Sequence, residues 1–216
     1  SAHEHASDHA YSGGVSYSPT DPSPSPPMSR ASLVIGLYGA MAIGALLVAA
    51  SRGSPDLFRL DPDAEPWWFG VGPVIGFVIG LGVVWLTRIA TQRFRWARDL
   101  HASFRDLLGP LSDREIVILA IASSVGEELL FRGALLPWLG VWVQGIVFAL
   151  LHVGPGKRFL PWTASALVLG IAFGWLAQWT GNLGGPIAAH FTINYLNLKF
   201  IVGTEPVRGI AAIDAG

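Results

Sequence analysis

The residues that could do chemistry in this chain are a few acids, histidines and amides placed inside otherwise apolar stretches. Glu127 and Glu128 are adjacent, and Arg132 follows shortly after them. A charged side chain at the centre of a bilayer costs at least about 2.5–3.5 kcal/mol, so ionisable residues in membrane segments are functional candidates by default. These three residues therefore need either mutual pairing or a chemical purpose.

Helical spacing separates the two glutamates. Glu128 and Arg132 are i and i+4 with the acid first, which is the favoured order for an ion pair within one helix. Glu127 lies about 100° further round the helix. We expect Glu128 and Arg132 to neutralise each other while Glu127 faces a cavity. The alternative is a purely structural cluster of all three charges, since pairing is the usual fate of buried charge.

Two further pairs share the i, i+4 spacing. Phe148 and His152 form one pair, and His190 and Asn194 form the other, so each pair occupies one helix face. With a rise of 1.5 Å per residue, Glu127, His152, His190 and Asn194 fall within roughly ±6 Å of a common depth. Side-chain reach and helix tilt cover that scatter. The four residues can therefore meet in one cavity.

Such a cavity has the parts for amide hydrolysis. A carboxylate and an imidazole can act together as general base on a water molecule. A second imidazole and an amide NH₂ are donors that a tetrahedral oxyanion needs. The chain has no cysteine and no HExxH motif, and Ser123 and Ser124 lack the G-x-S-x-G context of a nucleophilic serine. Small hydroxyls in membrane helices usually serve close packing.

The elements that must position these residues are membrane helices. The chain of 216 residues is 51% hydrophobic and 13% charged, against about 25% charged in soluble domains, and its nine Trp suit two membrane interfaces. A net charge of −1 gives no basic field for nucleic acid. The absence of Cys excludes disulfides and cysteine metal sites. We predict an all-α, polytopic membrane helix bundle.

About six transmembrane helices and one amphipathic interfacial helix are expected. The third transmembrane helix should begin at Ser112 or Asp113, with Glu115 in its first turn, and end at Pro137. The interfacial helix should lie within 87–114 and break at Gly109-Pro110. The expected transmembrane segments are 33–50, 70–86, 112–136, 139–151, 161–179 and 185–200.

The chain divides into three parts. Residues 1–30, rich in Ser, Pro and His, should form a disordered cytoplasmic tail, and Met28 is a candidate start of the functional protein. Loose metal binding by His3, His5 and His9 is the less favoured interpretation of that tail. Residues 31–203 form the transmembrane domain, with the motif-bearing core at 113–200, and 204–216 form a short C-terminal tail.

Positive charge orients the bundle. Six arginines lie between the second and third apolar stretches, which predicts a cytoplasmic loop there. By alternation, Lys157-Arg158 and Lys199 fall on the same side, as do both termini. The six arginines of the predicted cytoplasmic loop are Arg88, Arg93, Arg95, Arg98, Arg105 and Arg114.

The three motifs resemble a known family. Glu127-Glu128-x-x-x-Arg132, Phe148-x-x-x-His152 and His190-x-x-x-Asn194, in this order, are similar to the motifs of the CAAX protease and bacteriocin-processing (CPBP) family of intramembrane endopeptidases. Phe131-Arg132-Gly133 and the turn at 180–183 also resemble that family. The match covers about residues 113–200.

The resemblance implies roles for these residues. Glu127 and His152 would activate the hydrolytic water, while His190 and Asn194 would form the oxyanion hole; Glu128, Arg132 and Phe148 would be supporting residues. A Zn²⁺ site made by Glu127, His152 and His190 is the alternative. We favour a metal-free site because Asn194 is a poor zinc ligand and a good oxyanion donor.

The resemblance further implies a peptide or protein substrate at the bilayer. C-terminal sorting tails, prenyl-type CAAX tails and bacteriocin-like peptides are the classes to consider, and the short chain suits a bacterial plasma-membrane member. A non-catalytic immunity or scaffold protein that binds a peptide in the same cavity is the competing hypothesis. A proton-coupled transporter is disfavoured because the sequence lacks an internal repeat of broken helices.

Overall fold

The computed structural model describes residues 29–53 and 56–205, and most of them are helical. Within these ranges the one β feature is an isolated bridge between Arg59 and Asn182. The all-α prediction is therefore confirmed. The elements in order are α1 (Arg30–Ser51), α2 (Trp68–Arg93), α3 (Arg95–Leu108), α4 (Asp113–Glu128), the π-helix η1 (Leu129–Leu135), α5 (Leu136–Leu150), the 3₁₀ turn η2 (Lys157–Phe159), α6 (Leu160–Thr180) and α7 (Gly184–Gly203).

The predicted tails lie almost wholly outside the described residues, as do His3, His5 and His9. Ser29 and Arg30 are exceptions, because the Ser29 side chain caps α1 by accepting from the Ser32 amide and Arg30 begins the helix. The predicted C-terminal tail contributes only Thr204 and Glu205 to the described part of the chain.

Four helical stretches among the described residues are long and apolar enough to cross a membrane. The protein is an integral membrane protein with a bundle of such helices. α7 has 20 residues but is not among the four, because His, Asn and Lys side chains interrupt its apolar character. The predicted number of six spans stays a prediction. The four stretches are Arg30–Ser51, Trp68–Arg93, Asp113–Leu150 and Lys157–Thr180.

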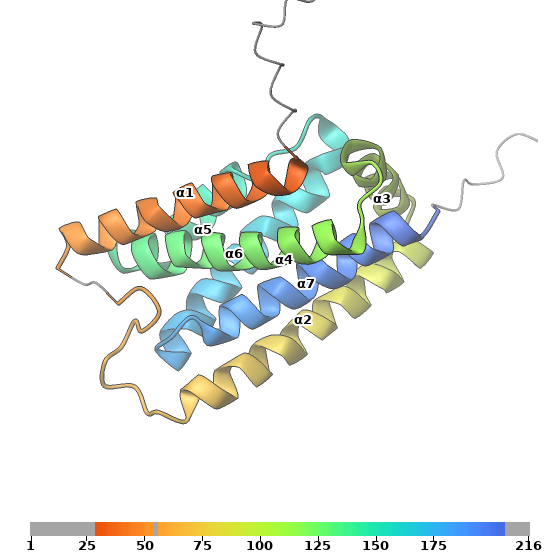
Figure 1. Cartoon of the computed structure of the whole chain (residues 1–216). Coiled ribbons are helices and arrows are strands. Elements are labelled where there is room, and N and C mark those ends of the chain that lie inside the picture. The colour runs from red at the N-terminus through yellow and green to blue at the C-terminus, as the bar shows by residue number, and fades with distance from the viewer. Residues whose placement is uncertain (1–28, 54–55, 206–216) are drawn as a thin grey trace, which may run out of the picture.

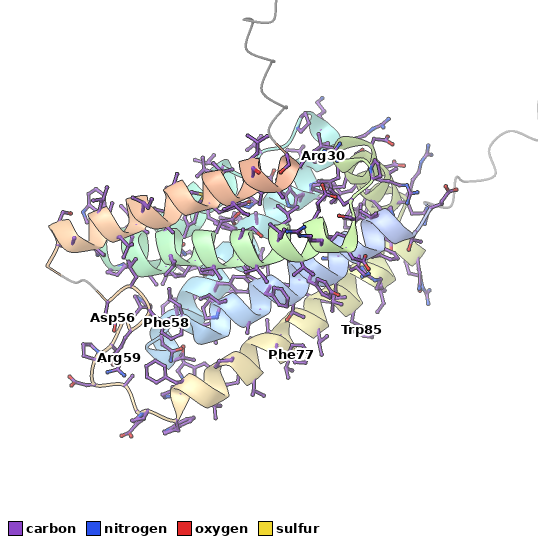
Figure 2. All side chains as sticks on the ribbon, in the orientation of Figure 1. Arg30, Asp56, Phe58, Arg59, Phe77 and Trp85 are labelled. Atoms are coloured by element: carbon purple, nitrogen blue, oxygen red, sulfur yellow. The ribbon has the colours of Figure 1, made fainter. Side chains whose placement is uncertain are left out.

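α7 lies between α4 and α2 in a row of neighbouring helices that begins with α1 (Figure 1). α5 and α6 pack against each other behind this row (Figure 1). Glycines of α2 bring it close to α7: a Cβ on Gly76 would lie 1.9 Å from the Gly185 carbonyl oxygen. Small residues drive such close helix packing in lipid. On the lipid side, Phe77 and Trp85 project from α2 (Figure 2).

The expected interfacial helix is shorter than predicted. α3 covers Arg95–Leu108 and ends at Gly109, whose φ of 63° breaks the helix as expected. Residues 87–93, however, continue α2. The reason is that Arg88 is satisfied within the bundle, where its guanidinium donates to the Asn197 side chain at 2.9 Å and the Leu196 carbonyl at 2.8 Å.

The third predicted segment begins as expected and ends later. Ser112 and Glu115 form a capping box at the start of α4. The chain does not leave the helix at Pro137, because this proline lies in the first turn of α5, where a missing amide N–H is tolerated. The break comes at Gly140, with φ 72° and ψ 170°.

The basic segments share one end of the bundle. The Arg30 guanidinium donates to the Leu108 and Pro110 carbonyls, both at 3.1 Å, and Lys199 pairs with Asp113 at 2.8 Å. Arg105 likewise donates to backbone carbonyls at the C-terminal end of α7, those of Val202 and Thr204. Asp56, Phe58 and Arg59 mark the opposite end (Figure 2). The grouping agrees with the predicted alternation, while the side of the membrane stays a prediction.

Candidate active site

Glu127 of α4 is the centre of the site. Its Oε2 atom lies 3.6 Å from Nε2 of His152 and 3.8 Å from Nε2 of His190. Glu127 is only 7% exposed, and this Oε2 has no hydrogen-bond partner. Buried polar atoms normally have one, so this oxygen stands out. The structure thus brings together a carboxylate and two imidazoles from three separate parts of the chain.

His152 follows the end of α5 and is held on several sides. Its Nδ1 lies 2.7 Å from the Phe148 carbonyl, and its own carbonyl accepts from the Thr163 hydroxyl at 2.8 Å. The ring packs between Phe148, 4.2 Å away, and Trp162, 5.2 Å away. Since Nδ1–H donates to a carbonyl, a neutral His152 presents the lone pair of Nε2 to Glu127.

Glu128 holds His190 as well as Arg132. Its Oε1 accepts from Arg132 Nη1 at 3.0 Å, which is the i, i+4 contact expected from the sequence. The same oxygen accepts from His190 Nδ1 at 2.8 Å. This second contact was missed, because helical periodicity within α4 does not reveal the partner on α7. Glu128 therefore orients His190 so that Nε2 faces Glu127.

Arg132 is fully buried and anchors this network to α6. Its Nη2 donates to the Gly170 carbonyl at 3.2 Å, and that carbonyl also accepts from Gln144 Nε2 at 2.8 Å. The Phe148 ring lies 4.5 Å from the guanidinium carbon, in a cation–π arrangement. Sequence reasoning missed Gln144, although a lone amide in the middle of an apolar stretch was a usable signal.

Asn194 is near the site but not in its centre. Its Nδ2 donates to the Ser123 hydroxyl at 2.9 Å, and Ser123 lies one turn before Glu127 on the same face of α4. An amide NH₂ has two hydrogens, so one remains for another acceptor. Three of the four predicted residues therefore converge, and the fourth is held one helical turn away by Ser123.

The zinc alternative concerns Glu127, His152 and His190. In the described part of the chain, no group of three or more His, Cys, Asp or Glu side chains is arranged to hold a metal ion. Glu127, His152 and His190 are chemically suitable zinc donors, and Oε2 of Glu127 lies 3.6 and 3.8 Å from the two imidazole Nε2 atoms. A chelation experiment tests whether the protein depends on a metal.

Fold and site together define an integral membrane helix bundle with a buried glutamate–histidine centre. Residues 114–196 match the model of the Rce1-like family, described as "Type II CAAX prenyl endopeptidase Rce1-like". This segment contains all three motifs. The match confirms the resemblance to CAAX proteases over these residues.

A curated relative matches part of the chain. The chain is 39% identical over 82 residues to the "Uncharacterized protein YpbD" of Bacillus subtilis (strain 168), which covers 37% of this chain and 41% of that protein. The chain thus spans about two fifths of that relative's length. No solved structure matches the chain.

Proposed function

We propose that this protein is an intramembrane endopeptidase that hydrolyses a peptide bond with a water molecule activated by Glu127 and His152. The observation that carries the proposal is the approach of two imidazole Nε2 atoms, at 3.6 and 3.8 Å, to one buried oxygen of Glu127. The family description of residues 114–196 as endopeptidase-like supports it. The proposed site chemistry requires no metal.

In this mechanism Glu127 is the general base. The water oxygen attacks the carbonyl carbon of the scissile bond while one water proton passes to the Glu127 carboxylate. The lone pair of His152 Nε2 accepts a hydrogen bond from the same water and so helps to orient it. As the C–N bond breaks, Glu127 returns the proton to the leaving amine. The products are a carboxylic acid and an amine.

His190 and Asn194 are proposed to stabilise the tetrahedral oxyanion. Because Glu128 occupies the Nδ1 side of His190, Nε2 can donate to an oxyanion only when the ring carries both protons. The second Nδ2 hydrogen of Asn194 is the other donor, and one such donor is worth about 2.7–4 kcal/mol.

The substrate is proposed to be a peptide or protein at the bilayer surface. The family description refers to CAAX prenyl endopeptidases, so a C-terminal tail of a membrane-bound protein is the first class to test, alongside sorting tails and bacteriocin-like peptides. The bacterial relative supports a bacterial plasma membrane. We place the basic end of the bundle, and both termini, in the cytoplasm.

The test compares wild-type protein with Glu127→Gln in the same membranes. We expect new peptide termini, detected by mass spectrometry of membrane proteins, with wild-type protein but not with Glu127→Gln. Glu65→Gln, which changes an exposed loop acid, is the matched control and should behave as wild type. Equal processing by Glu127→Gln would reject the proposal. Retention of bound, uncut peptides by wild-type protein would favour the peptide-binding alternative.

A chelation experiment addresses the metal-free mechanism separately. Cleavage should persist after exhaustive treatment with EDTA, because the proposed base and donors are all protein groups. Loss of cleavage that only added Zn²⁺ restores would contradict this part of the proposal and favour the alternative site at Glu127, His152 and His190.

A further inference from the structure

α1 lies outside the family-matched segment 114–196, yet it packs against α4 and η1, which carry Glu127 and Arg132. It packs along α4 at Gly126, the residue immediately before Glu127. A Cβ on Gly126 would lie 3.1 Å from the Cβ, Cδ1 and carbonyl oxygen of Tyr38. Glycine at this position therefore allows Tyr38 to approach the α4 backbone closely.

This close approach brings the Tyr38 side chain to Glu127. The half-buried phenol lies near enough to Glu127 to feel the charge of its carboxylate, and the Oε2 atom of that carboxylate has no hydrogen-bond partner. Tyr38 is thus a further side chain near Glu127, beside His152 and His190. It comes from the opposite side of α4 to α7, since α1, α4 and α7 form neighbouring members of one row (Figure 1).

The hydrogen-bonding chemistry gives Tyr38 a distinct role. His152 and His190 each engage Nδ1 with an acceptor, so their neutral rings offer only lone pairs at Nε2. Two acceptors cannot hold a third acceptor, the Glu127 carboxylate, in place. A phenol O–H is a donor. Among the described side chains that face Glu127, Tyr38 is the one that donates without first gaining a proton.

We propose that Tyr38 is a positioning residue whose hydroxyl donates to the Glu127 carboxylate and holds it against the two histidines. The inference rests on the proposed function, in which Glu127 is the base. It extends the site from the family-matched segment to α1. Hydrogen bonds to charged groups are stronger than those between neutral groups. A carboxylate held in one rotamer is in the reactive orientation for a larger fraction of the time, which raises the reaction rate.

The first test is Tyr38→Phe, which keeps the ring packed on Gly126 and removes only the hydroxyl. The substrate is a synthetic membrane peptide, in vesicles, that contains a cleavage site distinguishing wild-type protein from Glu127→Gln. We expect kcat to fall about tenfold or more with KM and Tm unchanged. Tyr195→Phe is the matched control: this ring stacks on Phe191 within α7, and kcat should stay at the wild-type value.

A second variant moves Tyr38 without changing it. Gly126→Ala introduces a Cβ that forces Tyr38 to shift by a few tenths of an ångström, so kcat should fall although the hydroxyl remains. Combining it with Tyr38→Phe should cost less than the two separate losses together, because both act on one contact. Gly39→Ala, whose Cβ would enter open space, is the control for a glycine change next to Tyr38.

The outcomes separate the inference from the function on which it rests. If Tyr38→Phe keeps wild-type kcat while Glu127→Gln is inactive, the inference fails and the function stands. A Tyr38→Phe protein with lowered Tm and unchanged kcat also overturns it, since that pattern is purely structural. If Glu127→Gln cleaves as wild type does, the proposed function itself fails.

Discussion

At the scale of single residues, the adjacent glutamates have different environments although they are chemically identical. The sequence was enough to predict the division, because one helical step turns Glu127 away from the i, i+4 pair of Glu128 and Arg132. It did not predict that Glu128 also binds His190. Such a contact depends on how α7 is rotated about its axis relative to α4. The spacing of residues within one helix does not determine this rotation.

This division predicts opposite effects on stability at neighbouring positions. Glu128→Gln leaves the fully buried Arg132 guanidinium without its counter-charge, which costs about 3–5 kcal/mol in comparable buried pairs. Glu127→Gln removes a carboxylate whose Oε2 has no hydrogen-bond partner, so Tm should stay equal or rise. Thermal unfolding of both variants in detergent checks this, and a larger loss for Glu127→Gln would contradict the assignment.

The amide of Asn194 gives a second prediction at this scale. Asn194→Ala should lower kcat about 10²-fold, because an oxyanion donor is lost. Ser123→Ala should lower kcat by a smaller factor, because it frees the Asn194 side chain without removing it. Steady-state cleavage of the vesicle-bound peptide measures both. Equal losses in the two variants would indicate that Ser123 has a direct part in the reaction.

At the scale of elements, one predicted helix start and one predicted helix end are correct, while the predicted end at Pro137 is wrong. The Ser112–Glu115 capping box and the helix-breaking Gly109 are local signals, and both are correct. Pro137 is also a local signal, but its position in a first turn makes it compatible with the helix. The π-helix at Leu129–Leu135 was not predicted. Its i→i+5 bonding coincides with buried Arg132 and its contact to Gly170, and π-turns are frequent at functional sites.

The close packing of α2 on α7 predicts that a larger residue at Gly76 destabilises the bundle. Gly76→Ala places a Cβ 1.9 Å from the Gly185 carbonyl oxygen, so α2 must move away from α7. We expect a loss of stability of about 1–3 kcal/mol, as overpacking typically costs, together with reduced activity because α7 carries His190. Gly82→Ala, on the same helix with open space around its Cβ, should change neither. Thermal unfolding of both variants decides the matter.

At the scale of the whole molecule, sequence charge predicted which segments share an end of the bundle. Several arginines at the basic end of the bundle also connect helices. Arg30 and Arg105 donate to backbone carbonyls at helix ends, and Arg88 donates to residues of α7. Charge counting treats these side chains as topology signals and does not reveal such contacts. These contacts help to fix the helices relative to one another, and so help to bring together the site residues of α4, α7 and the end of α5.

The orientation of the bundle is directly testable because the chain contains no cysteine. A single cysteine at Lys157, an exposed residue at the basic end, should be blocked by a membrane-impermeant maleimide only after the cell membrane is opened. A single cysteine at Arg59, in the loop that binds the turn at Asn182, should react in intact cells. The physical reason is that retained Lys and Arg mark the cytoplasmic side of short loops. The reverse labelling pattern would invert the bundle, and the scissile bond would then be reached from the outside, because His152 lies near the end that carries Lys157.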